Sequence, residues 1–569
     1  MDRHPPRSTS DEIDLYVRTY YSLLRSTGEV QVRAFEEAHA FSQSSLHPGA
    51  RDPKVDVAAF AYSAARLPVC MPSVTHIALG QSNEQFEQIG LPVREWQPVT
   101  TRGRRRPLRW DGGNRLAVFI TSSSDIDDLV PIVTAYQIEW NKMHRSLAHC
   151  QAGEALAAGR DVDADAVRTA LDFDERDYET LKSALGSEYL RALGQIAGRI
   201  SARSVLLVNG TFLEYQRAAN RWWSGIEPTY MGPARSRRPV FFVSSNTHSL
   251  ANLLGGYALS HRDKLIEYAR QTNPEGLAEP LNQAISRGDE ATVSNISYYL
   301  LRQYLHDQSD AADRIFSTQR FDAESGITTV VSPGKIDVSA QLIELDKLRP
   351  ERLDPRVRVP GVDRLASSDA VIINIDYPLG MSAYHHLSSL AQGVGEIRGV
   401  YIMGKAATLN GKVGDVMLSS AAYDEHSKNT FLFRNCFRAS DVQRFVQLGT
   451  VLDNQKALTV RGSFLQNRDY MRVYHQVGYT VLEMEAGPYL AALYELMRPT
   501  RHPKDEVVHL SNEMPCDFGL LHYASDTPYS RRQSLLSKSL SYFGVDSTYG
   551  CSIAIVRQIL GREILRLEG

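Results

Sequence analysis

Hydrophobic residues in the last third of the chain fall into short runs that alternate with helical patterns. "DAVIINID", "RGVYIMG" and "GYTVLEME" are rich in aliphatic and β-branched residues, as strands are. A turn follows each run, and two turns lead into stretches in which apolar residues recur at helical spacing. Strands that alternate with helices predict a mostly parallel sheet covered by helices on both faces. Ligands on such sheets lie beyond the carboxyl ends of the strands.

Helix patterns dominate the first half of the chain. Apolar residues recur every three to four positions in residues 11–65, 161–202 and 263–308. The segments that start at Leu116 and Pro239 instead run from a strand pattern through a Ser-rich corner into a helix pattern. Such corners cap helices, and they can also bind anions through free backbone amides. We therefore predict a mixed α/β but helix-rich N-terminal domain.

Prolines interrupt the pattern between residues 320 and 363, and a domain boundary is expected there. We place the N-terminal domain, whose role the sequence does not indicate, at residues 1–325. A second domain is predicted at residues 326–569. The stretch that begins at Gly326 is a candidate for its early strands.

Composition excludes several classes of function. The 63 basic and 66 acidic residues give a formal charge of −3, which does not indicate a nucleic-acid partner. Five scattered cysteines without a CxxC pair favour a reducing compartment and indicate no metal site. No window approaches the roughly 18 apolar residues of a membrane helix. We expect a cytoplasmic protein with no membrane partner, no metal and no cofactor.

Five arginines occur between Thr100 and Arg115, in a stretch that reads as a loop. A solvated charged loop is the simpler interpretation. A loop that closes over an anion is the alternative.

Five segments of the last third resemble, in order and spacing, the purine nucleoside phosphorylase and nucleosidase superfamily, over residues 368–569. They are "VIINIDYPLGMSAYHHLSSLAQ", "VYIMGKAATLNGKVGDVMLSS", "VRGSFLQ", "VLEMEAG" and "YASDTP". The resemblance implies a three-layer αβα domain that binds a small-molecule nucleoside or nucleotide, and a homo-oligomer.

The resemblance also implies a catalytic acid, Asp526, which would protonate or hydrogen-bond a purine N7. This role needs a raised pKa, which burial at a strand end would supply. The alternative is a helix N-cap, because Asp526 precedes Thr527-Pro528.

Glu485 matches the ribose-binding carboxylate of the family, and Met484 would lie against the sugar. Glu483 lies on the same side of the predicted strand, so two close carboxylates would raise one pKa. Glu483 is therefore a second catalytic candidate, for sugar binding or water activation. The remaining substrate-binding candidates are Phe464 and Leu465 against the base, with Gly404, Lys405, Ala406, Ser525 and Gly380 at the turns.

The sequence departs from the family at the turn Ile402-Met403-Gly404-Lys405, where the phosphate-binding arginine of the phosphorylases is missing. This departure favours water as the nucleophile, and thus an N-ribosyl hydrolase for a purine nucleoside or nucleotide. Lys405 could hold a phosphate, either as co-substrate or on a nucleotide, as in AMP nucleosidase, which also has an N-terminal extension. Phosphorolysis and a non-catalytic nucleoside-binding protein remain the alternatives.

Overall fold

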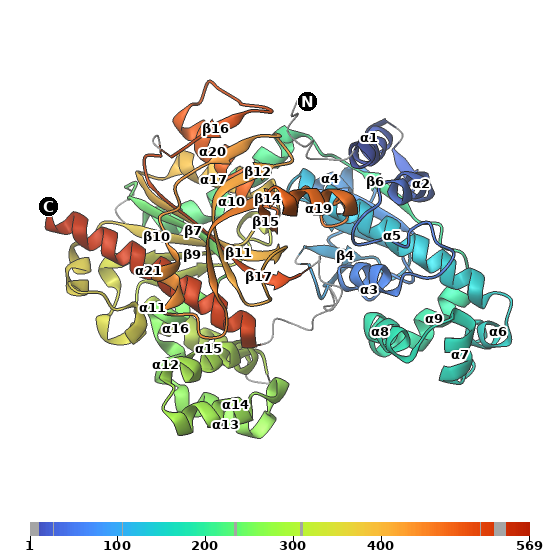
Figure 1. Ribbon diagram of the computed structural model, residues 1–569, viewed down its shortest axis with the longest axis horizontal. Coiled ribbons are helices and arrows are strands. Elements are labelled where there is room, and N and C mark those ends of the chain that lie inside the picture. The colour runs from blue at the N-terminus through green and yellow to red at the C-terminus, as the bar shows by residue number, and fades with distance from the viewer. Residues whose placement is uncertain are drawn as a thin grey trace.

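The computed structural model shows two β-sheets with helices around them (Figure 1). It describes residues 11–26, 28–104, 106–232, 236–307, 311–511, 514–527 and 542–569. No helix within these ranges has both the length and the apolar composition needed to cross a membrane.

The smaller sheet belongs to the N-terminal part of the chain and has the strand order β1-β6-β2-β5-β4-β3. Its three central neighbours β6, β2 and β5 run parallel. The strands are β1 (Glu29–Gln31), β2 (His76–Gly80), β3 (Gln97–Val99), β4 (Leu108–Trp110), β5 (Arg115–Phe119) and β6 (Ser204–Leu207).

Helices surround this sheet, and the long helix α5 (Ser123–Leu147) is mostly buried in its core. Tyr136 and Trp140 of α5 are fully buried there. The other helices are α1 (Asp11–Ser26), α2 (Arg33–Phe41), α3 (Val57–Ala65), α4 (Asn83–Gln88), α6 (Gln151–Ala157), α7 (Ala164–Leu171), α8 (Glu175–Leu185) and α9 (Tyr189–Gly198).

The larger sheet is mixed and has the order β16-β13-β12-β14-β15-β11-β7-β10-β9-β8, with β17 paired to both β11 and β12. Its strands are β7 (Val240–Ser245), β8 (Ile327–Val330), β9 (Ala340–Glu344), β10 (Val371–Asp376), β11 (Ile397–Thr408), β12 (Val416–Asp424), β13 (Thr430–Leu432), β14 (Val451–Thr459), β15 (Tyr479–Glu483), β16 (Val507–His509) and β17 (Asp517–Asp526).

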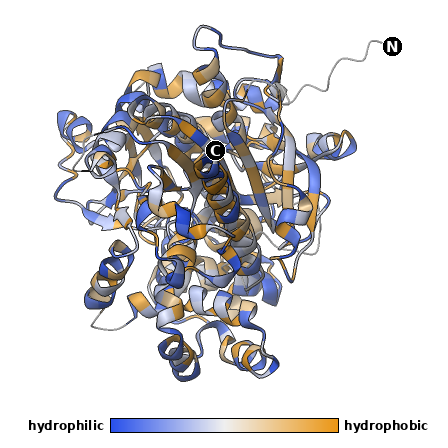
Figure 2. Cartoon of the chain, turned by 90° about the vertical axis from the view of Figure 1, so that its left-hand side faces the viewer, coloured by the Kyte–Doolittle hydropathy of each residue, from blue (hydrophilic) through white to orange (hydrophobic). Residues whose placement is uncertain are grey.

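Helices cover both faces of the larger sheet, as the three-layer αβα prediction requires. Alternate residues of β7 show the two faces, because Phe242 packs with α10, α17 and α20, whereas Phe241 packs with α11, α15 and α21. Figure 2 shows apolar residues concentrated on the interior strands. The helices of this part are α10 (Phe212–Met231), α11 (Ser249–Gly255), α12 (Tyr257–Ser260), α13 (Arg262–Thr272), α14 (Ala278–Arg287), α15 (Glu290–His306), α16 (Ala311–Ala323), α17 (Ser382–Gly393), α18 (Ala439–Gln443), α19 (Arg468–Gln476), α20 (Ala486–Met497) and α21 (Tyr542–Glu568).

Strand β7 lies between β11 and β10 and is parallel to both. The larger sheet therefore contains a strand from before the predicted boundary at residues 325/326. The strand–corner–helix pattern at Pro239 is present as β7 and α11, but it belongs to the larger sheet. The matching pattern at Leu116 is β5 and α5 of the smaller sheet.

Five strands of the larger sheet close into a ring. Strand β11 pairs with β17, β17 with β12, β12 with β14, β14 with β15, and β15 again with β11. The closure brings the end of β15 beside the end of β11, which a flat parallel sheet would not do.

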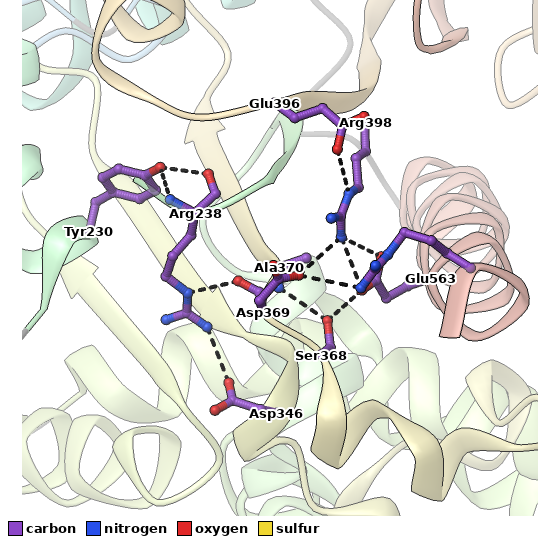
Figure 3. Close-up of polar contacts among 10 residues, drawn as sticks. Tyr230, Arg238, Asp346, Ser368, Asp369, Ala370, Glu396, Arg398 and Glu563 are labelled. Carbon is purple, nitrogen blue, oxygen red and sulfur yellow. Dashed lines mark hydrogen bonds and ion pairs between the residues drawn. The ribbon is translucent and has the colours of Figure 1, made fainter. Parts of the chain in front are cut away.

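An ion-pair network lies at the amino end of β7, β10 and β11, opposite to the edge where these strands end (Figure 3). Glu563 of α21 accepts hydrogen bonds from Arg398 Nη1 at 2.8 Å, from Ser368 Oγ at 2.6 Å and from Arg566 Nη2 at 2.8 Å. Its side chain is fully buried. The network fixes α21 against the starts of the strands.

We expect Glu563→Ala to lower the free energy of unfolding by about 3 kcal/mol, because it removes a fully buried carboxylate that accepts hydrogen bonds from Arg398, Ser368 and Arg566. Against the opposing effect of burial, hydrogen bonds from Arg566 and Ser368 lower the pKa of Glu563. Its contribution is therefore present above the pKa of an ordinary glutamate and is lost as the pH falls below it. Urea unfolding measures the loss. The control is Glu568→Ala on the same helix, where the exposed pair with Arg364 predicts a change below about 1 kcal/mol.

Candidate active site

The carboxyl end of β11 joins three of the segments that the sequence singled out. Ala407 of β11 pairs with Leu482 of β15 on one side and with Asp526 of β17 on the other. The turn residues that precede Ala407, the glutamates that follow Leu482, and Ser525-Asp526 therefore meet at one edge of the sheet.

Glu485 is buried at the start of α20 and is tied to the glycine turn after β10. Its Oε1 accepts a hydrogen bond from the Gly380 N–H at 3.1 Å, and the Tyr377 hydroxyl is a further partner. Burial and the negative charge of Glu483 raise the pKa of Glu485 to about 8. The Glu485 carboxyl is therefore protonated in most molecules at neutral pH.

Only glycine fits at position 380 in this arrangement. Its φ is +53°, and a Cβ would lie 2.2 Å from Oγ of Ser124 in α5. The same hydroxyl accepts a hydrogen bond from the Met381 N–H at 2.9 Å. The start of α5 thus packs directly on the turn that holds Glu485.

Glu483 is held by the start of α20. One carboxylate oxygen accepts hydrogen bonds from the N–H groups of Glu485 at 2.7 Å and Ala486 at 2.6 Å, and the other accepts one from Thr459. Burial raises its pKa to about 7 in spite of these bonds. The predicted placement of both glutamates on one side of the strand was wrong, because β15 ends at Glu483 and Glu485 is the N-cap of α20; the turn between them still brings them close. A role of Glu483 in activating water remains a prediction.

Asp526 ends β17 and is partly exposed. Its Oδ1 accepts a hydrogen bond from the Thr527 N–H at 2.8 Å, and burial raises its pKa to about 6. The raised pKa is the direction that a catalytic acid needs. The helix that the N-cap alternative needs would start at Pro528, outside the described residues. The Ser525 hydroxyl donates to the Ala406 carbonyl at 3.4 Å, which links β17 to β11.

Tyr377 and His522 belong to this edge, although the sequence motifs did not indicate them. A Cβ on Gly404 would lie 2.2 Å from Cζ of Tyr377, so the glycine lets the ring lie against β11. The Tyr377 oxygen lies 3.3 Å from Nε2 of His522, which is 4.0 Å from Oε2 of Glu483. Burial lowers the pKa of His522 to about 3, so the imidazole is neutral. The two glutamates are thus connected through a tyrosine and a histidine.

The other predicted residues of this edge differ in exposure. Lys405 is exposed on β11, whereas Ala406 is buried in the core beneath the strand. Met484 is partly buried and packs beside Leu482 and Leu409. Lys405 and Met484 therefore have surface that a ligand could contact.

Phe464 and Leu465 lie elsewhere. Both are 1% exposed in the core of the N-terminal part. The Phe464 ring centroid lies 5.3 Å from that of Tyr62, 5.8 Å from that of His39 and 6.4 Å from that of His47. In this structure the ring packs between the two parts of the chain and has no open face for a base.

Two arginines of the N-terminal part bring positive charge to the carboxylates. Arg104 lowers the pKa of Glu485, and Arg66 lowers that of Asp526, each against the larger effect of burial. Arg104 is fixed by two hydrogen bonds to Asp128, at 3.0 and 2.6 Å. No local motif marks Arg66, which follows α3 and lies over the Tyr62 ring, with Cζ 3.4 Å from the ring centroid.

The arginine-rich loop is bound within the protein at each described arginine. Arg106 pairs with Asp125 at 2.9 Å, Arg102 donates to the Ser183 and Ala184 carbonyls, and Arg109 donates to three carbonyls around Val93. Arg105 lies outside the described residues. The expected solvated loop is therefore wrong, because Arg106 is buried in ion pairs and Leu108–Trp110 form strand β4. The internal contacts of these arginines do not favour the anion-binding interpretation either.

In both Ser-rich corners a side chain of the corner accepts hydrogen bonds from the backbone N–H groups before or at the start of the following helix. Asp125 accepts hydrogen bonds from the Thr121 N–H at 2.6 Å and the Ser122 N–H at 3.3 Å. Asn246 accepts them from the His248 N–H at 3.1 Å and the Ser249 N–H at 2.7 Å. The amides are thus satisfied by capping.

A family model described as "Family of unknown function (DUF6909)" matches residues 32–561. The chain belongs to this family. No curated protein matches the sequence of this DUF6909 member.

Solved structures show the likeness to nucleosidases and phosphorylases that the motifs predicted. The 5′-methylthioadenosine/S-adenosylhomocysteine nucleosidase of Neisseria meningitidis, in complex with methylthio-immucillin-A, is 13% identical, with a TM-score of 0.29 over 44% of this chain and 96% of that one. The corresponding enzyme of Colwellia psychrerythraea 34H, with adenine, is 12% identical, with a TM-score of 0.26 over 42% and 86%. Uridine phosphorylase of Schistosoma mansoni, with thymidine, is 12% identical, with a TM-score of 0.24 over 34% and 71%. Similarity at this level carries no argument about the activity of the DUF6909 protein.

Its described residues contain no group of three or more His, Cys, Asp or Glu side chains arranged to hold a metal ion. The side chains at the strand-end edge are carboxyls, a tyrosine and a neutral histidine, with two cations nearby.

Proposed function

We propose that the protein is an N-ribosyl hydrolase that cleaves the N-glycosidic bond of a purine nucleoside or nucleotide. The observation that supports this best is the placement of Asp526 and Glu485 at the end of β11, both with raised pKa values. Cleavage develops positive charge on the ribose and negative charge on the leaving base. An acid beside one group that fixes the sugar meets both needs.

In this proposal Asp526 gives its proton to the base, at N7 of a purine, as the bond to the ribose breaks. Glu485 accepts hydrogen bonds from two vicinal ribose hydroxyls. Met484 offers the sugar a polarizable apolar surface. Water adds to the ribose carbon and releases a proton, which replaces the one that Asp526 gave, so the products are free base and ribose, or ribose phosphate from a nucleotide.

Water is favoured over phosphate as the nucleophile because the turn before Lys405 lacks the arginine of the phosphorylases that its motif resembles. Lys405 is exposed beside this turn and can hold a substrate phosphate as a point charge.

Incubation of the purified protein with a panel of purine nucleosides and nucleotides tests this proposal. We expect base release in phosphate-free buffer, with free ribose or ribose 5-phosphate as the second product, detected by chromatography. Release that requires added phosphate and yields ribose 1-phosphate would assign phosphorolysis instead. Binding without base release under either condition would assign a non-catalytic nucleoside-binding protein.

A further inference from the structure

A groove of about 700 Å³ lies between α6 and α9, in the helical group at the end of the molecule away from the larger sheet (Figure 1). This volume is typical of sites for small organic ligands. The charged and polar residues that line it are Ser73, Arg160, Asp161, Arg191, Gln195 and Arg199.

One face of α9 forms a wall of this groove. Arg191, Gln195 and Gly198 are spaced by three to four residues, which places them on one side of the helix. A Cβ on Gly198 would meet only the Ala157 side chain, at 3.8 Å. The position is open, and a larger side chain there would project into the groove.

The groove is positively charged. Three arginines line it, against a single acidic residue, Asp161. Arg199 uses one nitrogen to donate to the Pro72 carbonyl at 2.6 Å, which fixes the side chain and leaves its other N–H groups for a ligand. Arginines are suited to phosphate because their N–H groups match two of its oxygens at once.

A buried amide oxygen behind the wall of the groove has no hydrogen bond within the structure. Gln195 donates from Nε2 to Ser73 Oγ at 3.4 Å, but its Oε1 is buried and has no hydrogen-bond partner within the structure. A buried polar atom without a partner is costly, and most such atoms in proteins are paired. Because this oxygen has no accessible surface in the structure, recognition in the groove rests on the three arginines.

We propose that this groove binds a phosphorylated small molecule. Its phosphate contacts Arg160, Arg191 and Arg199. A phosphate carries nearly two negative charges and three acceptor oxygens, so it engages several arginines better than a carboxylate does. The site is independent of the strand-end carboxylates and does not rest on the proposed hydrolase activity.

The groove is connected to the candidate active site through α5. Trp140 Nε1 donates to the Arg199 carbonyl at 3.0 Å, and His144 Nδ1 lies 2.8 Å from the Ile196 carbonyl. The opposite end of α5 carries Ser124, which contacts the turn of Glu485. A ligand in the groove would therefore lie against α9, which in turn contacts the helix that supports the active-site turn.

Isothermal titration calorimetry of the full chain tests the site, with inorganic pyrophosphate and ATP as two separate probes. We expect at least one probe to bind, and Arg191→Ala and Arg160→Ala each to weaken that binding roughly tenfold or more. Arg217→Ala is the matched control, because this exposed arginine on α10 pairs with Glu214 outside the groove. Its binding constant is expected to be unchanged.

Gly198→Leu provides a second test that removes no charge. It fills the groove and is expected to abolish binding of ATP, while circular dichroism and urea unfolding report whether the fold is retained. If ATP alone binds, the organic part contributes; if pyrophosphate binds equally well, the phosphates suffice, and both results support the site. No heat with either probe at millimolar concentration, or binding that these variants leave unchanged, would overturn the proposal.

Discussion

Asp526→Asn is expected to lower the rate of base release about 10²- to 10⁴-fold, the usual contribution of a general acid. Asparagine keeps the size of the side chain and an oxygen that can accept from the Thr527 N–H. It has no proton to give to the leaving base. Affinity for the nucleoside, measured by calorimetry, is therefore expected to change much less than the rate.

Asp517→Asn is the matched control for this variant. Asp517 lies at the other end of the same strand and pairs with Arg562, away from the carboxylate edge. We expect it to leave the rate of base release unchanged. Wild-type turnover in Asp526→Asn would remove Asp526 from the role of the acid.

Glu485→Gln is expected to lower kcat/KM at neutral pH by about 10²-fold without loss of the fold. Glutamine resembles the protonated carboxyl that predominates near pH 7, and it can still accept from the Gly380 N–H. It lacks the second acceptor oxygen that binds two ribose hydroxyls, and several kcal/mol of transition-state binding depend on such bonds. Unchanged urea unfolding at pH 7 would show that the loss is functional.

The pH profile gives this variant a second, sharper readout. The proposed mechanism needs Asp526 protonated and Glu485 ionised, while their pKa values are about 6 and about 8. At pH 7 only on the order of one percent of molecules has both groups in the required state. Between pH 6 and pH 8 the gain in ionised Glu485 offsets the loss of protonated Asp526, so wild-type kcat/KM should be level there. It should fall below about pH 6, where Asp526 is already protonated and the ionised fraction of Glu485 still decreases. It should also fall above about pH 8, where Glu485 is already ionised and the protonated fraction of Asp526 still decreases.

Glu483 also titrates in this range, with a pKa of about 7, but Asp526 is the only remaining group whose protonation state the proposed mechanism specifies in Glu485→Gln. The residual kcat/KM is therefore expected to fall in a single step centred near pH 6, without a decline on the acid side. A profile that keeps the wild-type shape, with limbs at 6 and 8, would mean that Glu485 does not produce either limb.

Local patterns predicted the strand-end carboxylates because each signal lies within a few residues. The apolar run before Glu483, and the turn to helix after Glu485, indicate a strand end without knowledge of its partners. The same holds for β17 and Asp526. Their meeting at Ala407 also depends on the register of β11 with two strands that lie far along the chain.

What the sequence did not reveal depends on contacts between distant segments. The place of β7 in the larger sheet is fixed by pairing with β10 and β11, more than a hundred residues later. Phe464 looks like a ligand-stacking aromatic from its motif alone. Its packing is decided by His39 and Tyr62, some four hundred residues earlier. The effect of Arg66 on the pKa of Asp526 is likewise non-local.

The segment around Phe464 has a consequence for how the molecule comes apart. Arg461 pairs with Asp127 of α5 at 3.3 Å. Leu465 lies in the core of the N-terminal part, although strand β14 before it and helix α19 after it belong to the part of the chain that forms the larger sheet. Neither half can lose its structure without exposing apolar surface that the other covers. The two sheets are therefore expected to melt as one cooperative unit, and a protease cut between them should release no stable fragment.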